Sequence, residues 1–168
     1  MIKKVLLAIA LICPMLLSAQ TIKIGLVDFG SVLQALPDYT AAMNQIKEVS
    51  DKYAAEFQKL NEEMNRQMTE WQNMPENELP AIKERKAREI SDYNQKIQQF
   101  EQSAGQDLQN MQNDLMKPIT AKISQAVESI GREGNFSLIQ LYDPQLVLYR
   151  AEPVEDITPA VKAKLGIN

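Results

Sequence analysis

Side chains that could carry out covalent or acid–base chemistry are scarce in this sequence. The 168 residues include no histidine and one cysteine, Cys13. Because histidine is the commonest general base and metal ligand in proteins, its absence excludes Ser-His and Cys-His nucleophile pairs and zinc–histidine sites. The sequence also has no glycine-rich phosphate loop and no GxSxG motif. It therefore predicts a protein that is not an enzyme and that uses no cofactor and no metal.

Carboxylates are the remaining reactive groups. Those considered as candidates fall on predicted helix faces: Glu62, Glu63, Glu70, Asp107 and Asp114. A di-iron helical bundle needs Glu-x-x-His motifs, which a sequence without histidine does not contain. We interpret these side chains as solvated helix charges, with a carboxylate-dependent hydrolase as a minor alternative.

A shared helical spacing groups four apolar residues near the middle of the chain. Met64, Met68, Trp71 and Met74 form a stripe at steps of three and four residues. Methionine is flexible and polarizable, so such a stripe suits partners of variable shape. Internal packing is the alternative. The stripe is predicted to face a basic group made of Lys83, Arg85, Lys86 and Arg88. Charged head groups cover methionine and tryptophan poorly. Either the apolar stems of the lysines and arginines cover the stripe, or the stripe is left partly open.

The same basic group has two interpretations of its own. It could make weak contact with anionic lipid headgroups at a membrane surface, or with acidic segments of a partner. A solvated helix face is the simpler interpretation.

Two long helices must position the stripe. Apolar residues recur every three or four positions over Asp38–Met74 and again, less regularly, over Ala81–Lys117, and each stretch has 37 residues. Each would be about 55 Å long as a helix. A lone helix with one narrow apolar stripe is unstable in water, so each helix needs a partner. The pattern predicts an antiparallel coiled-coil hairpin, the arm, over residues 37–118 with its tip at 75–80.

The ends of the chain are predicted to form a small body from residues 21–36 and 119–168. Alternation predicts a strand over Thr21–Asp28, followed by a short helix over Val32–Leu36 capped by Ser31. Pro118 is expected to kink or end the second arm helix. The apolar stripe continues beyond it to Ile130.

The C-terminal part of the body is predicted to hold two strands and a helix. Gly131 and Gly134 are expected to stop the long helix. Strands are expected at Phe136–Tyr142 and Leu146–Ala151, on either side of a turn at Tyr142–Gln145 that contains Pro144. The second strand is apolar on both faces, so we expect it to be buried on both sides. A last helix is expected after Thr158 as its cap, with Pro159 first and Gly166 just past its end.

The predicted fold class is therefore α+β, with a small β-rich body and a long helical hairpin. The body has 66 residues, which is small for an independent core. We expect a homo-oligomer for that reason.

The first twenty residues resemble a signal peptide. A basic start at Met1–Lys4 precedes an apolar run, Val5–Leu17, and small residues precede Gln20. The run is shorter than the ~20 residues of a spanning helix. Cleavage after Ala19 or Gln20 would remove Cys13 and leave an exported chain with no disulfide.

The balance of charge then argues against one class of partner. Without residues 1–20 the chain has 16 basic and 22 acidic residues. An acidic chain without a basic stripe binds nucleic acid poorly, so we expect no nucleic-acid partner.

The order of these features resembles the Skp/OmpH family of periplasmic chaperones. The resemblance covers nearly the whole mature chain. It depends on the coiled arms and on three short segments around them: Ile24–Asp28 with Val32–Gln34, Tyr142-Asp143 before Leu146–Tyr149, and Asp156–Thr158 before the last helix. It implies a periplasmic trimer whose bodies join and whose arms hold unfolded outer-membrane proteins without ATP. Carried over by position, it implies assembly through Ile22, Ile24, Leu26, Val27, Leu146 and Leu148, and client binding by the arms.

A second function remains open at this point. A structural coiled-coil spacer or adaptor of the cell envelope would show the same helical pattern. A spacer should pack its apolar stripe fully, whereas a holdase chaperone should leave part of it accessible to clients.

Overall fold

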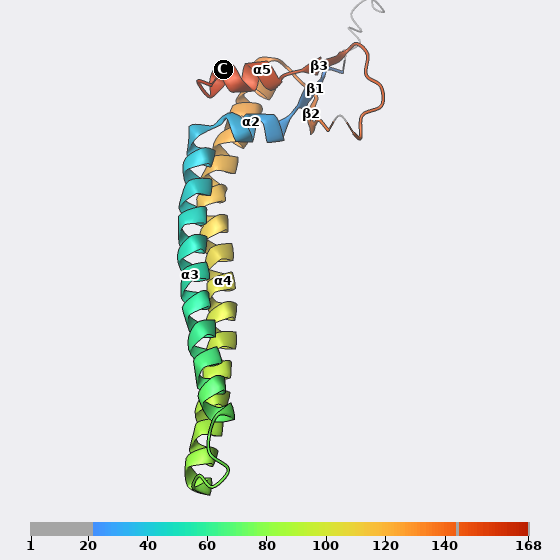
Figure 1. The fold of residues 1–168 in the computed structure, drawn as a ribbon. Helices are drawn as coiled ribbons and strands as arrows, with labels where there is room; N and C mark the ends of the chain where they lie inside the picture. Colours follow the sequence, from blue (N-terminus) through green and yellow to red (C-terminus); the bar gives the residue numbers. More distant parts are fainter. Residues whose placement is uncertain (1–21, 144, 168) are drawn as a thin grey trace, which may run out of the picture. The chain divides into compact units, whose positions relative to one another are not determined.

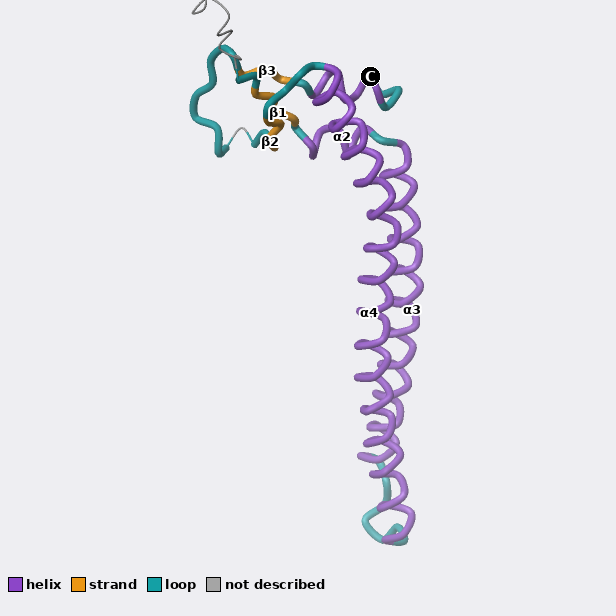
Figure 2. Tube along the Cα trace, turned by 180° about the vertical axis from the view of Figure 1, so that it is seen from behind, coloured by secondary structure: helices purple, strands orange, loops and turns teal. Residues whose placement is uncertain are grey.

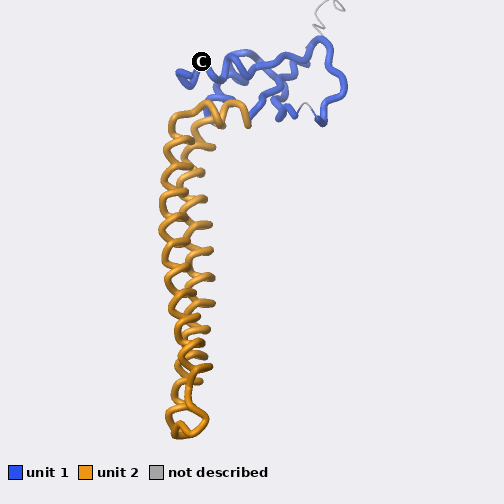
Figure 3. Tube along the Cα trace, in the orientation of Figure 1, with its two compact units in different colours: residues 1–29, 125–168 blue, residues 30–124 orange. Residues whose placement is uncertain are grey.

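A computed structural model describes residues 22–143 and 145–167 of the chain. The predicted signal peptide and Pro144 lie outside the described residues. The elements follow the order β1 (Ile24–Val27), α2 (Phe29–Ala35), α3 (Pro37–Gln72), α4 (Pro80–Glu133), β2 (Leu138–Leu141), β3 (Val154–Asp156) and α5 (Thr158–Lys164) (Figure 1). They divide into two compact units, one from residues 22–29 and 125–167 and the other from residues 30–124 (Figure 3).

The first unit contains a small parallel sheet. Its strand order is β2-β1-β3, and β1 pairs in parallel with both neighbours. Gly25 lies opposite Ile139, and a Cβ on Gly25 would come within 3.1 Å of the Ile139 side chain. The glycine therefore lets β1 and the residues beside it approach closely. Leu26 and Val27, which are 5% and 2% exposed, supply the buried part of this strand.

One predicted strand is wrong. Leu146–Ala151 has no strand structure, and β3 lies further along the chain at Val154–Asp156. Leu148, expected to be buried on both sides, is 96% exposed. The topology explains the error, because β2 and β3 flank β1 in parallel and the chain between them must run from one side of β1 to the other. An apolar sequence pattern does not reveal that connection.

The last helix begins with a different cap from the predicted one. Thr158 lies inside α5, and its hydroxyl accepts a hydrogen bond from the Asp28 N–H at 2.9 Å. The N-cap residue is Ile157, and Asp156 Oδ1 just before it accepts the Thr158 N–H at 3.0 Å in an Asx turn. Burial alone would raise the pKa of Asp156, but the hydrogen bonds from Thr158 and the nearby Arg150 guanidinium hold it below its ordinary value. Gly166, with φ of 73°, follows the helix as predicted.

The short helix after β1 also starts earlier than predicted. Because α2 begins at Phe29, Ser31 lies inside the helix and does not cap it. Asp28 directly precedes the helix, and aspartate is favoured at that position.

Two long helices, α3 and α4, make up most of the second unit, and they run side by side in both views (Figures 1 and 2). Asp38 pairs with Lys122, and Glu70 pairs with Lys86, so residues late in α3 contact residues early in α4. Pro118 does not end α4, which continues to Glu133. Ile119 is 5% exposed just after the proline, so packing outweighs the hydrogen bond that Pro118 cannot donate.

The C-terminus of α4 is set by Asn135 and not by the two predicted glycines. Gly131 lies within the helix, whereas Asn135 has φ of 52° in the left-handed region. The Phe136 N–H donates to the Gly131 carbonyl at 2.9 Å, as in a Schellman motif. A Cβ on Gly134 would lie 2.5 Å from the Phe136 ring, so this glycine serves close packing beside the stop.

Candidate binding surface on the distal arm

The predicted apolar stripe lies at the C-terminal end of α3. Met68 is 42% exposed and Trp71 is 46% exposed, whereas Met64 and Met74 are half-buried. Large apolar side chains with this exposure are available for contact with another molecule. The return helix therefore leaves part of the stripe uncovered.

Lys86 of α4 pairs with the part of α3 that carries the stripe. It takes the position between Ile82 and Ile90 at which the helical pattern calls for an apolar residue. Its side chain is only 15% exposed, and its Nζ lies 2.8 Å from Glu70 Oε2. The same ammonium donates to the Gln67 side-chain oxygen. Lys86, Glu70 and Gln67 thus form a polar layer between α3 and α4 beside the stripe.

The polar layer extends along α3. Gln67 Nε2 donates to Glu63 Oε1 at 2.6 Å, and Arg66 pairs with the same carboxylate. The hydrogen bond from Gln67 and that from Arg66 lower the pKa of Glu63 below its ordinary value. These contacts lie within α3, and Lys86 connects them to α4 through Gln67 and Glu70.

Burial divides the arm into two parts. Every residue from 61 to 96 is described, and none is buried; we call residues 61–96 the distal segment. Residues 38–60 and 97–118, the proximal segment, include the buried side chains of Leu60, Ile97 and Ala104. Apolar packing that holds the two helices together is therefore concentrated in the proximal segment.

An aromatic cluster stabilises the proximal segment. The rings of Tyr53 and Phe100 lie 5.9 Å apart at 75°, an edge-to-face contact between α3 and α4. The Tyr53 hydroxyl donates to Asp107 Oδ2 at 3.0 Å, and this hydrogen bond raises the pKa of Tyr53. Phe57, one turn after Tyr53 on α3, is half-buried.

All four cations of the predicted basic group already have partners, Lys86 as described above. Arg85 pairs with Glu89 at 3.6 Å and Arg88 pairs with Glu84 at 3.8 Å, each within α4. Lys83 Nζ donates to the Glu76 carbonyl at 3.0 Å. These contacts fit the interpretation of a solvated helix face.

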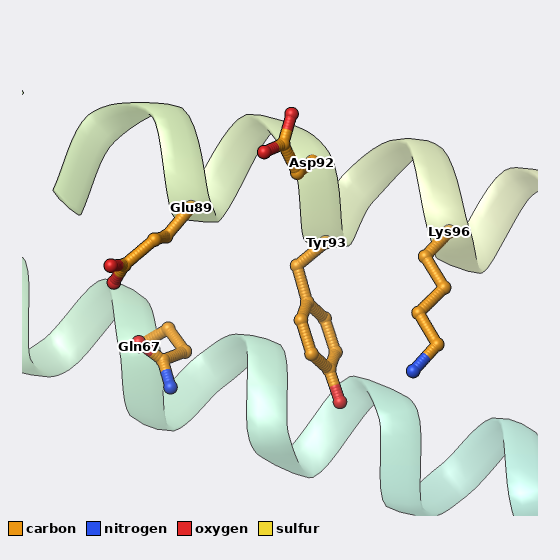
Figure 4. A pocket seen from close by; sticks show the side chains of 5 residues that line it. All are labelled: Gln67, Glu89, Asp92, Tyr93 and Lys96. Carbon is orange, nitrogen blue, oxygen red and sulfur yellow. The ribbon is translucent and has the colours of Figure 1, made fainter. Parts of the chain in front are cut away.

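A shallow groove lined by polar side chains lies next to Gln67, and most of its lining residues belong to α4. Gln67, Glu89, Asp92, Tyr93 and Lys96 line it (Figure 4). The Tyr93 side chain extends from α4 toward α3, whereas Asp92 points away from that helix (Figure 4). No cluster of side chains suited to a metal ion occurs among the described residues.

The residues predicted to mediate assembly of the body differ in their exposure to solvent. Leu26 and Val27 are buried within one chain, whereas Ile22, Leu146 and Leu148 are 64%, 79% and 96% exposed. Ile24 is half-buried. Sequence reasoning missed further exposed apolar residues of the same unit: Leu138, Leu141 and Tyr149. Two of them belong to β2, an edge strand, and no local signal distinguishes an edge strand from a central one.

Comparison with known proteins places the chain in a family. The model of the outer membrane protein (OmpH-like) family matches residues 23–165, and the chain belongs to that family. The protein called Chaperone protein Skp in Salmonella typhimurium strain LT2 is 26% identical over 160 residues, covering 95% of this chain and 96% of the relative. Chaperone protein Skp of Escherichia coli strain K12 is 27% identical with the same coverage. The resemblance found in the sequence is therefore confirmed.

Among the described residues, no helix is both long enough and apolar enough to cross a membrane.

Proposed function

We propose that this protein is an ATP-independent periplasmic holdase chaperone that binds unfolded outer-membrane proteins and prevents their aggregation. Its family membership and relatives called chaperones support the proposal. The observation that carries it is the exposure of Met68 and Trp71 beside the polar layer of Lys86, Glu70 and Gln67.

The exposed stripe has a suitable strength for holding clients reversibly. At about 25 cal/mol per Å² of apolar surface, covering the free parts of Met68 and Trp71 contributes on the order of 3–5 kcal/mol before ordering costs. A contact of that size is readily exchanged. An unfolded outer-membrane protein exposes apolar side chains along its length and can make many such contacts.

Assembly would turn weak contacts into retention. We propose that α3 and α4 form an antiparallel coiled-coil arm and that three chains join through their bodies. Ile22, Leu146 and Leu148 are exposed in one chain and would become buried in the trimer. Three arms around one client bind more tightly than one, because each contact raises the effective concentration of the others.

Client binding is tested by diluting a urea-unfolded outer-membrane protein into buffer with the purified chaperone and following light scattering. The variant Met68→Ser with Trp71→Ser should suppress aggregation less than the wild type does. The matched control is Asn65→Ser with Gln72→Ser, because both residues are exposed on the same stretch of α3. Equal suppression by both variants, with helicity and mass unchanged, would reject the stripe as the client-binding surface.

Assembly is tested by sedimentation equilibrium. The wild type should have the mass of a trimer, and Leu148→Asp should dissociate it, because a carboxylate would be buried without a partner. Gln145→Asp, which also adds a charge at an exposed position of the same connection, should leave the trimer intact. A wild-type monomer at micromolar concentration would contradict the proposal.

A structural spacer of the envelope is the second candidate. The packed aromatic contact between Tyr53 and Phe100 favours it, because a rigid arm suits a spacer as well as a chaperone. A wild-type protein that fails to suppress aggregation of any unfolded outer-membrane protein would favour the spacer.

The basic group enters the proposal only as a weak membrane contact. Lys83, Arg85, Lys86 and Arg88 would attract anionic headgroups, but their existing partners reduce that attraction. Sedimentation with phosphatidylglycerol vesicles at low salt, against phosphatidylcholine vesicles, tests this contact. Equal sedimentation with both kinds of vesicle would exclude it.

A further inference from the structure

The distal segment lacks the packing that stabilises the rest of the arm. Its cross-helix contacts are centred on Lys86, whose Nζ reaches Glu70 and Gln67 of α3 and lies 3.8 Å from Glu89 of its own helix. The nearest buried apolar residues are Leu60 and Ile97, at the boundary with the proximal segment. Pairing of the helices beyond this boundary therefore depends on polar contacts and half-buried side chains.

A charged residue at an apolar coiled-coil position has a known physical effect. It specifies how the helices align, but it lowers their stability, because desolvating the charge offsets much of the attraction to its partners. The partner Glu70 has a half-exposed side chain, so solvent also screens the ion pair. Segments with few buried apolar contacts open locally at a lower free energy than the packed core does.

We propose that the distal segment opens locally as one unit while the proximal segment stays paired, and that Lys86 determines how readily it opens. Opening separates the two helices from residue 61 to residue 96. It uncovers four apolar side chains that are half-buried in the closed arm: Met64, Met74, Ile82 and Ile90.

The consequence for clients depends on the function proposed above. In the closed arm the accessible apolar surface of the stripe is limited to the exposed parts of Met68 and Trp71 and the edges of their neighbours. In the open state the full stripe and the facing isoleucines become available to one unfolded chain. The arm would then adjust its apolar surface to the client without ATP, and the surface would close again after release.

Hydrogen exchange read by mass spectrometry tests the opening directly. In the wild type, peptides within residues 61–96 should exchange about tenfold or more faster than peptides within residues 97–115. The variant Lys86→Leu places an apolar residue in the stripe and should slow exchange in the distal segment by about tenfold or more. Exchange in the proximal segment should stay the same.

The matched control is Arg88→Leu, which removes one positive charge and adds one leucine on the same helix. Arg88 pairs only with Glu84 of α4 among the ion pairs of the described residues. The control should leave exchange in the distal segment unchanged. Equal slowing by both variants would show that added hydrophobicity, and not the polar layer, controls the opening, and it would overturn the proposal.

A second variant tests the partner. Glu70→Ala removes the cross-helix ion pair of Lys86 and should speed exchange in the distal segment without affecting the proximal segment. Unchanged exchange in both Lys86→Leu and Glu70→Ala would overturn the role of Lys86. Uniform exchange along the wild-type arm would overturn the local opening itself.

The link to clients is decided in the aggregation assay. If opening serves client binding, Lys86→Leu should suppress aggregation less than Arg88→Leu does. Full suppression by Lys86→Leu, with distal exchange slowed, would overturn that link while leaving the opening intact. Failure of the wild type to suppress aggregation would reject the proposed chaperone function and would not alter the exchange result.

Discussion

The proximal and distal segments of the arm share one sequence pattern but differ in packing. In the proximal segment the pattern produces buried side chains such as Leu60 and Ile97, and an edge-to-face contact joins Tyr53 to Phe100. In the distal segment the pattern continues through Met68 and Trp71, yet no side chain is buried. The difference shows that periodic spacing aligns a stripe but does not by itself bury it.

The largest expected difference between the segments is in the cost of truncating an apolar residue. Leu60→Ala should lower the free energy of unfolding by about 2–4 kcal/mol, because it leaves a cavity between the helices. Met68→Ala, at an exposed position, should lower it by less than about 1 kcal/mol. Urea denaturation followed by circular dichroism measures both. Similar costs at the two positions would contradict the division of the arm.

The aromatic contact should have a smaller effect. Phe100→Ala should lower the free energy of unfolding by about 1–3 kcal/mol, because Phe100 is half-buried and its edge-to-face contact is lost. A double-mutant cycle with Tyr53→Leu should give a coupling of about 0.5–1.5 kcal/mol. A coupling of zero would show that the two rings do not stabilise each other.

High pH should weaken the proximal segment selectively. Because the hydrogen bond to Asp107 raises the pKa of Tyr53 in the folded arm, its stabilisation is present below the unfolded pKa and is lost as the pH rises through the folded pKa. The helicity of the wild type should therefore fall at alkaline pH. Tyr53→Phe should reduce this alkaline loss, and an identical pH profile for that variant would count against the contact.

Low pH should weaken the distal segment, and we expect this effect to be the smallest of the four. Hydrogen bonds from Gln67 and Arg66 lower the pKa of Glu63, so its stabilisation is present above the unfolded pKa and is lost as the pH falls through the folded pKa. Trp71 is the one tryptophan of the chain and lies in this segment, so its fluorescence reports on it. The acid change in Trp71 fluorescence should shrink in Glu63→Gln. A change of equal size in that variant would assign the transition to another group.

The long helices were predictable because their signals are local. The spacing of three and four residues and the prolines at 37 and 80 placed α3 and α4 within one or two residues of their observed starts. The family resemblance also followed from the order of elements along the chain, and the family match confirms it. The stripe residues could be named from the sequence, but their exposure could not.

Only the tertiary structure decided what those patterns become in space. The segment Leu146–Ala151 has the composition of a buried strand, yet the parallel pairing of β2 and β3 with β1 makes it an exposed connection. Leu26 and Val27 look like assembly residues, but the fold of one chain already buries them. Lys86 looks like one of several surface cations, and only the fold places it opposite Glu70 and Gln67 with a side chain that is 15% exposed. In each case the sequence determines the chemistry of a side chain, whereas burial depends on groups that are distant along the chain and adjacent only in the fold.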